Sequence, residues 1–68
     1  MFGLKPEQYF LFLTVHVKHL RTLESKERQM ELSLKNIKEV IWDEEEDCLK
    51  VYYRNGDWWH YTKSEEWY

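Results

Sequence analysis

"VYYRNGDWWHY", residues 51–61, holds six aromatic rings, His60 included, around a single Asn-Gly pair. An Asn-Gly pair between two strand-like runs predicts a hairpin with a two-residue type I′ turn, because both central residues of that turn need positive φ. This turn would pair Tyr52 with Trp59. One face of the hairpin would then hold Leu49, Val51, Tyr53, Trp58 and His60, and the other Lys50, Tyr52, Arg54, Asp57, Trp59 and Tyr61.

A third strand, at residues 37–42, is predicted to join this hairpin through an acidic loop. If residues 44–47 form the connection, Val40 and Trp42 share the apolar face with Leu49 and Val51. A loop one residue longer would reverse this assignment, because side chains alternate between the two faces of a sheet. The acidic loop, with the residue before it, consists of Asp43, Glu44, Glu45, Glu46 and Asp47.

The N-terminal half can be interpreted as two more strands. "FLFLTVHV", residues 10–17, is rich in β-branched and aromatic residues, and apolar and polar residues alternate in "MELSL", residues 30–34. With a turn near Ser25-Lys26, the chain would form a five-stranded antiparallel meander that curls into a small barrel. We favour this mainly β fold, a single domain over residues 1–68, because the alternation in residues 30–34 continues directly into the strand at Ile37.

The alternative is an α+β fold, in which a long N-terminal helix packs on a three-stranded antiparallel sheet. Pro6 suits the first turn of such a helix, and Glu7 would lie near its positive end. A heptad-like stripe supports it: Tyr9, Leu13, His16, Leu20, Leu23, Glu27, Met30 and Leu34. At the other end of the chain, Ser64 is expected to cap a turn or short helix, with Trp67 and Tyr68 folding back on the sheet.

Composition narrows the class of protein. Cys48 is the only cysteine, so an intramolecular disulfide is excluded and a reducing, cytoplasmic location is expected. The apolar run of residues 9–17 is too short to span a bilayer, which takes about 20 residues in a helix, and it lacks the flanks of a signal peptide. Residues 1–35 carry six Lys/Arg and four Glu, whereas residues 36–68 carry four Lys/Arg and nine Asp/Glu. The acidic C-terminal half favours basic partners.

No catalytic or metal-binding pattern emerges. His16 and His19 would share one face of a helix, yet no closely spaced Cys or His pair completes a zinc site with them. Cys48 follows five acidic residues, which raise the pKa of its thiol and disfavour the reactive thiolate. There is no glycine-rich phosphate loop, and a chain of 68 residues can hardly enclose a deep cleft. We therefore expect neither an enzyme nor a cofactor or metal site.

The mixed face of the hairpin is the best candidate for function. Tyr, Trp and Arg dominate the energetics of protein interfaces, and the predicted partner-binding residues are Tyr52, Arg54, Trp59, Tyr61 and Lys50. We expect a small regulator or inhibitor that binds a protein, with the acidic loop attracting a basic partner. Single-stranded nucleic acid, stacked on the same rings, is the alternative. An unpaired strand edge or the N-terminal apolar stripe would also allow a homodimer. The simplest alternative for the mixed face is that it is buried in the fold and has only a structural role.

Overall fold

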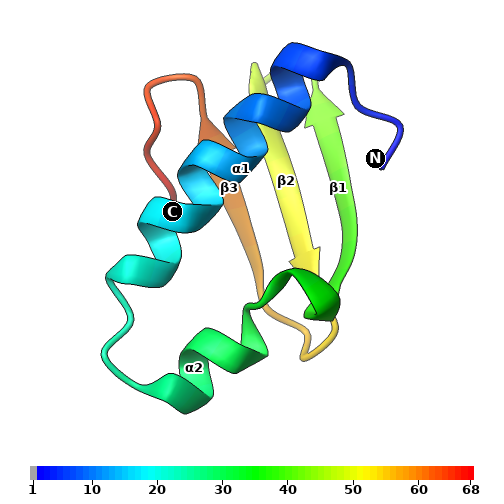
Figure 1. The fold of residues 1–68 in the computed structure, drawn as a ribbon. Helices are drawn as coiled ribbons and strands as arrows, with labels where there is room; N and C mark the ends of the chain where they lie inside the picture. The colour runs from blue at the N-terminus through cyan, green and yellow to red at the C-terminus, as the bar shows by residue number, and fades with distance from the viewer. Residues whose placement is uncertain (1) are drawn as a thin grey trace.

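A 16-residue helix lies across a three-stranded antiparallel sheet in the computed structural model, which describes residues 2–68 (Figure 1). The elements are α1 (Pro6–Arg21), α2 (Lys26–Glu31), the 3-10 helix η1 (Leu34–Asn36), β1 (Ile37–Asp43), β2 (Cys48–Tyr53) and β3 (Trp58–Thr62). The strand order is β1-β2-β3. The predicted five-stranded meander is therefore wrong, and the α+β alternative is confirmed. Within residues 2–68 no helix is long and apolar enough to cross a membrane.

Helix α1 forms where the strand at residues 10–17 was predicted, because its first turn and one of its faces suit a helix. Pro6 takes the first helical position, and the Lys5 backbone N–H donates to Gln8 Oε1 at 3.0 Å. The buried side chains follow helical spacing: Phe12, Val15, His16 and His19. The predicted stripe placed Leu13 and Leu20 on the buried face of the helix, and these two side chains are only partly buried. Residues 10–17 are apolar on several sides, so alternation within them could not identify the buried face.

Residues 30–34 form no strand: residues 30 and 31 end α2, residues 32 and 33 make a turn, and Leu34 begins η1. The Ser25 Oγ accepts hydrogen bonds from the backbone N–H groups of Glu27 and Arg28, at 3.1 and 3.4 Å, and so caps α2. Of the three alternating apolar residues in this segment, Leu32 is buried, while Met30 and Leu34 are exposed. The alternation of apolar and polar residues in this segment therefore did not indicate a strand. The cap at Ser25 favours helix α2 instead.

The β2–β3 turn differs from the predicted type I′ turn. Gly56 alone of the Asn-Gly pair has a positive φ, at 95°. Its N–H donates to the Tyr53 carbonyl, and the Tyr53 N–H donates to the Asp57 carbonyl. This pattern is that of a three-residue loop, which contains one more residue than the predicted turn. The strand register therefore shifts by one position, and Tyr52 pairs with Trp58.

The one-residue shift reverses the faces of β3. Val51 pairs with Trp59, and Leu49 pairs with Tyr61, so both aromatic residues join the apolar face of β2. By contrast, the predicted β1–β2 pairing is confirmed, with Asp43 opposite Cys48 and a four-residue loop between them.

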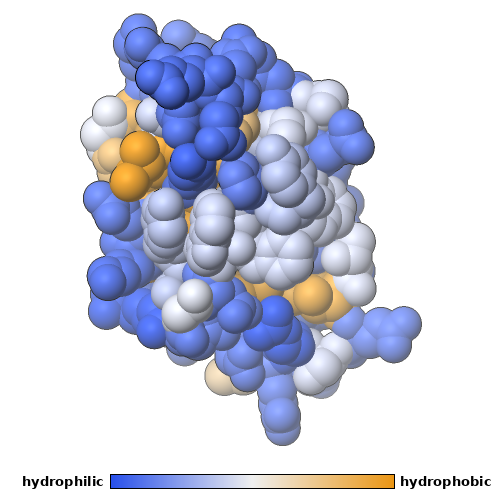
Figure 2. Space-filling model, turned by 180° about the vertical axis from the view of Figure 1, so that it is seen from behind, coloured by the Kyte–Doolittle hydropathy of each residue, from blue (hydrophilic) through white to orange (hydrophobic). Residues whose placement is uncertain are grey.

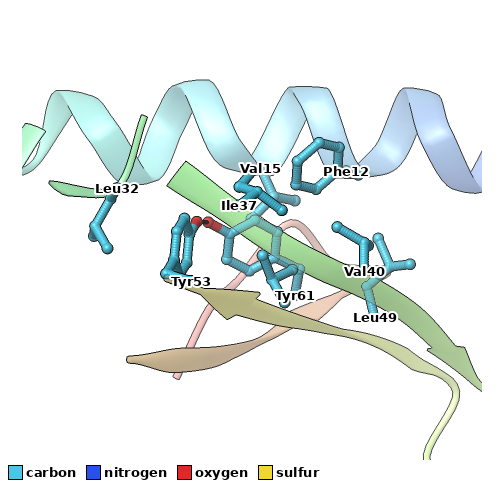
Figure 3. Close-up of a cluster of buried hydrophobic side chains, with 9 residues drawn as sticks. Phe12, Val15, Leu32, Ile37, Val40, Leu49, Tyr53 and Tyr61 are labelled. Carbon is cyan, nitrogen blue, oxygen red and sulfur yellow. Dashed lines mark hydrogen bonds between the residues drawn. The ribbon is translucent and has the colours of Figure 1, made fainter. Parts of the chain in front are cut away.

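The hydrophobic core fills the space between α1 and the facing side of the sheet (Figure 3). Figure 3 shows Phe12 and Val15 pointing down from the helix toward Tyr61, Val40 and Leu49 on the strands. The buried residues of this cluster are Phe12, Val15, Leu32, Ile37, Val40, Leu49, Val51, Tyr53 and Tyr61. Burying side chains of this size contributes about 1.5–3 kcal/mol each relative to exposure.

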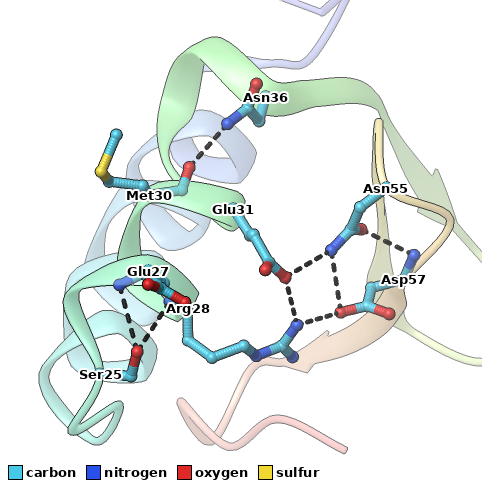
Figure 4. A network of polar contacts seen from close by, with 8 residues as sticks. All are labelled: Ser25, Glu27, Arg28, Met30, Glu31, Asn36, Asn55 and Asp57. Atoms are coloured by element: carbon cyan, nitrogen blue, oxygen red, sulfur yellow. Dashed lines mark hydrogen bonds and ion pairs between the residues drawn. The ribbon is translucent and has the colours of Figure 1, made fainter.

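A polar network joins α2 to the β2–β3 turn (Figure 4). Arg28 Nη1 lies 2.9 Å from Glu31 Oε2 and 2.9 Å from Asp57 Oδ2. The Asn55 side-chain amide donates to Glu31 Oε2 at 3.2 Å, and its oxygen accepts from the Asp57 N–H at 2.9 Å. These groups are partly exposed, so each ion pair contributes at most about 1 kcal/mol. The network fixes the position of α2 more than it adds stability.

The C-terminal residues form a turn and then run back along β3. Ser64 caps no helix, and Glu65 has a φ of 63°. Trp67 forms a bridge with Tyr61 and its ring packs against the core. The expectation that Trp67 and Tyr68 fold back on the sheet is thus confirmed.

Candidate functional site

Within residues 2–68, the sheet has one face that no helix covers, which we call the outer face. It is the side opposite α1, and Figure 2 views the molecule from that side. Two rows of paired residues cross it: Glu39, Tyr52 and Trp58 in one, and Ile41, Lys50 and His60 in the other. In Figure 2, pale aromatic side chains occupy the middle of this face, below a hydrophilic cap where the β1–β2 loop lies.

Four aromatic side chains form a continuous row on the outer face, which we call the ring ladder: Tyr52, Trp58, His60 and Tyr68. The Tyr52 and Trp58 rings stack with centroids 5.7 Å apart, and the Trp58 and His60 rings are 4.9 Å apart. The His60 and Tyr68 rings are nearly parallel at 4.4 Å. The row leaves Trp58 50% and Tyr68 64% exposed.

Backbone hydrogen bonds hold the last ring of the ladder in place. The His60 N–H donates to the Tyr68 carbonyl at 2.8 Å, and the Tyr68 N–H donates to the His60 carbonyl at 3.1 Å. The chain end is therefore fixed at the edge of β3, and Tyr68 is positioned as firmly as a strand residue.

Charged groups border the ladder at the β1–β2 end. Lys50 Nζ lies 3.0 Å from Asp43 Oδ2 and 3.3 Å from Glu46 Oε1. These two carboxylates raise the pKa of Lys50 above its ordinary value. Glu46 Oε2 also lies 3.4 Å from His60 Nε2. Lys50, on the outer face, is thus already paired with two acids of the same chain.

The acidic loop is an ordered turn. Asp43 Oδ1 accepts hydrogen bonds from the backbone N–H groups of Glu45 and Glu46, at 2.9 and 3.0 Å. The Glu46 N–H, followed by the Lys50 ammonium, lowers the pKa of Asp43. Asp47 pairs with Lys63 at 2.9 Å. Within residues 2–68, Glu44 and Glu45 make no ion pair.

The predicted partner-binding residues do not share one face. Lys50 and Tyr52 lie on the outer face, and Arg54 is exposed in the β2–β3 turn. Tyr61 is 0% exposed, and Trp59 is partly buried with its ring 4.6 Å from that of His19. Both therefore belong to the inner face, so the prediction that they share one face with Lys50 and Tyr52 is wrong.

Sequence reasoning missed Trp58, His60 and Tyr68 as outer-face residues. It assigned Trp58 and His60 to the apolar face, because it assumed a two-residue turn. The signal was present in the Asn-Gly-Asp sequence, since a three-residue loop with Gly in the left-handed position is the next most common hairpin connection.

Beneath the sheet, two histidines of α1 meet two tyrosines in a buried hydrogen-bonded chain. Tyr61 Oη lies 2.8 Å from His19 Nδ1 and 2.7 Å from Tyr53 Oη, and Tyr53 Oη lies 3.4 Å from His16 Nδ1. Burial lowers the pKa of His16. Burial, followed by the charges of His16 and Arg28, lowers the pKa of His19 to about 4. Burial raises the pKa of both tyrosines.

This chain of groups is sealed from solvent, so it has no route for a substrate. His16 is 2% and His19 1% exposed. His16 Nε2 and Trp59 Nε1 are the buried side-chain atoms without a hydrogen-bond partner among residues 2–68. In the same part of the chain, no three His, Cys, Asp or Glu side chains gather closely enough to hold a metal ion. We interpret the histidine-tyrosine chain as a structural element of the core.

Cys48 is buried at the start of β2. Burial, and then the nearby Glu46 and Asp43 carboxylates, raise the pKa of its thiol. The predicted direction is confirmed, although burial contributes more than the acidic run.

Comparison of the chain with protein-family models, with curated proteins and with solved structures gives no significant match.

Proposed function

We propose that this protein is a small non-enzymatic interaction module that binds a protein partner through its outer face. The observation that carries the proposal is the ring ladder, a continuous row of four rings in which Tyr52 stacks on Trp58 and His60 stacks on Tyr68, on a sheet face that no helix within residues 2–68 covers. Contiguous exposed aromatic surface of this kind is uncommon on a monomer and often marks an interaction site.

The ladder has the chemistry of an interface centre. Trp58 and Tyr68 are large, amphipathic and more than one third exposed, and Trp and Tyr are enriched among residues that dominate binding energy. Their stacking and the backbone bonds to Tyr68 fix the rings before a partner arrives. Little side-chain freedom is then lost on binding, which favours affinity.

A partner with an apolar patch bordered by Lys or Arg fits the surroundings of the ladder. Residues 36–68 carry nine acidic and four basic side chains. Glu44 and Glu45, at the tip of the loop beside the outer face, have no ion pair within residues 2–68. Such charges accelerate association with a basic surface more than they tighten binding. A regulator or inhibitor of a basic protein is the role that this combination supports best.

Nucleic acid is a poorer fit to the same rings. Single-stranded binders combine stacking rings with cations that follow the phosphates. Here Lys50 is paired with Asp43 and Glu46, and Glu39 lies beside Tyr52. Phosphate groups would therefore meet carboxylates at both rows of the outer face.

A site-specific photo-crosslinking experiment tests the proposal. A photoreactive phenylalanine analogue replaces Trp58 in one sample and Phe10 in a matched control, because Phe10 is an exposed ring, 73% accessible, on α1 and away from the sheet. We expect a defined protein adduct in host extract from position 58 and none from position 10. The crosslinked partner is then purified and titrated against the wild-type protein, Trp58→Ala and Phe10→Ala.

Trp58→Ala is expected to weaken binding about 30-fold, which corresponds to about 2 kcal/mol for a central interface ring. Phe10→Ala should bind as the wild type does. Equal affinities of Trp58→Ala and the wild type would overturn the proposal. Binding of a fluorescent single-stranded oligonucleotide that weakens steeply with salt and disappears in Trp58→Ala would replace it with the nucleic-acid alternative.

A further inference from the structure

The two edges of the sheet differ in whether another segment of the chain forms hydrogen bonds with the edge strand. The outer edge of β3 is covered by residues 66–68, through the two bonds between His60 and Tyr68 and a third from the Thr62 N–H to the Glu66 carbonyl at 2.9 Å. On the other side of the sheet, β1 pairs only with β2. Apart from the bond from the Ile37 N–H to the Leu34 carbonyl, no backbone hydrogen bond from elsewhere in residues 2–68 reaches residues 37–43 from outside the sheet. Unpaired N–H and C=O groups of such an edge are a template for another strand.

A groove runs along this open edge. It has a volume of about 460 Å³, and its walls are residues 38–42 of β1 on one side and Phe2, Leu4 and Gln8 on the other. In Figure 1 the N-terminal segment lies beside β1, at the edge of the sheet away from β3. The groove provides room for an added strand next to apolar side chains, which is the geometry of strand addition.

Charges at the two ends of β1 identify the strand that fits. Lys35 and Lys38 lie at its beginning, and Glu44 and Glu45 lie just after its end. All four are exposed, and none makes an ion pair within residues 2–68. An added strand therefore needs negative charge at one end and positive charge at the other. β1 itself, running in the opposite direction, has this pattern.

We propose that two copies of this chain pair antiparallel through their β1 edges, centred near Val40, to form one six-stranded sheet. The two-fold axis brings the lysine end of each strand beside the glutamate end of the other, so the same attraction occurs twice. A bulge between Ile37 and Glu39 distorts the start of β1, which confines regular pairing to the rest of the strand. A two-fold axis between antiparallel edges also leaves both outer faces on the same side, so the dimer would carry two ring ladders on one surface.

Charge reversal tests this dimer with little risk to the fold, because the reversed side chains are exposed. Sedimentation equilibrium over a concentration series should show dimerisation of the wild type. Lys35→Glu with Lys38→Glu should weaken self-association at least about tenfold, and Glu44→Lys with Glu45→Lys should do the same, because like charges then face each other. Lys26→Glu, an exposed lysine on α2, is the matched control and should dimerise as the wild type does.

Mixing the two double variants provides the decisive measurement. In a dimer of one chain of each double variant, the charges at both ends of the paired β1 strands are opposite again. The heterodimer should therefore form although neither variant associates alone. Hydrogen exchange gives a second readout, since amides in residues 37–43 should gain protection as the wild-type concentration rises. The proposal is overturned if the wild type stays monomeric at its highest soluble concentration, or if mixing gives no heterodimer. A dimer that Trp58→Ala abolishes and charge reversal leaves intact would also overturn it, because that dimer would use the ring ladder.

Discussion

Acidification should destabilise this protein through the buried histidines, and His19 allows the loss to be calculated. The pKa of His19 is about 4 in the folded protein, where it bonds to Tyr61, against 6.5 for an ordinary histidine. Above pH 6.5 the imidazole is neutral in both states, so stability does not depend on its titration. Below that pH the unfolded chain binds a proton that the folded protein excludes, and stability falls until the pH reaches about 4.

The size of the loss follows from the two pKa values. Between neutral pH and about pH 4.5, the unfolded state gains about 2.5 kcal/mol from protonation of His19 alone, at 1.36 kcal/mol per pH unit. The lowered pKa of His16 adds to the loss in the same direction. Small domains have total stabilities of about 5–15 kcal/mol, so the expected loss is a large share of the whole.

Urea denaturation followed by tryptophan fluorescence, repeated at several pH values, measures this loss. A separate NMR titration of the imidazole carbon-bound protons should show His19 titrating near pH 4. His19→Gln should flatten the dependence, because it removes the buried group whose pKa is lowered. If stability is constant between neutral pH and about pH 4.5, or if His19→Gln shows the full acid loss, the assignment of the loss to this group is refuted.

Two further predictions concern the hairpin. Gly56→Ala should lower the free energy of unfolding by about 1 kcal/mol in urea denaturation, because an added Cβ meets no atom within 4 Å and the cost is the positive φ of 95° alone; an unchanged midpoint would contradict this. Cys48 should react with a thiol reagent far more slowly in the folded protein than in urea, because it is 2% exposed and burial raises the pKa of its thiol; equal rates would show that the strand end opens readily.

The parts of the fold that sequence predicted are those in which local rules determine the answer. The β1–β2 pairing follows from a four-residue loop bounded by Asp43 and Cys48, and the structure has that register. The return of Trp67 to the core follows from the cost of leaving it in water. Helix and strand in residues 10–17 could not be separated, because Phe12 and Val15 satisfy the helical spacing while their neighbours also satisfy alternation. Packing on the sheet, which involves distant residues, decided between them.

The exposed face of β3 was assigned to the wrong rings because both faces of this strand are aromatic, and hydrophobicity alone does not distinguish them. Hydrogen bonding does. In the observed register the hydroxyl groups of Tyr53 and Tyr61 meet the imidazoles of His16 and His19 inside the core.

The rejected register would have buried Trp58 and His60 and left the Tyr61 hydroxyl in water. His19 would then have lost its bond to Tyr61, and a buried polar group without a partner costs about 1–3 kcal/mol. The spacing of His16 and His19 along α1 was therefore the sequence feature that could have identified which rings face inward, and by exclusion which rings lie on the outer face.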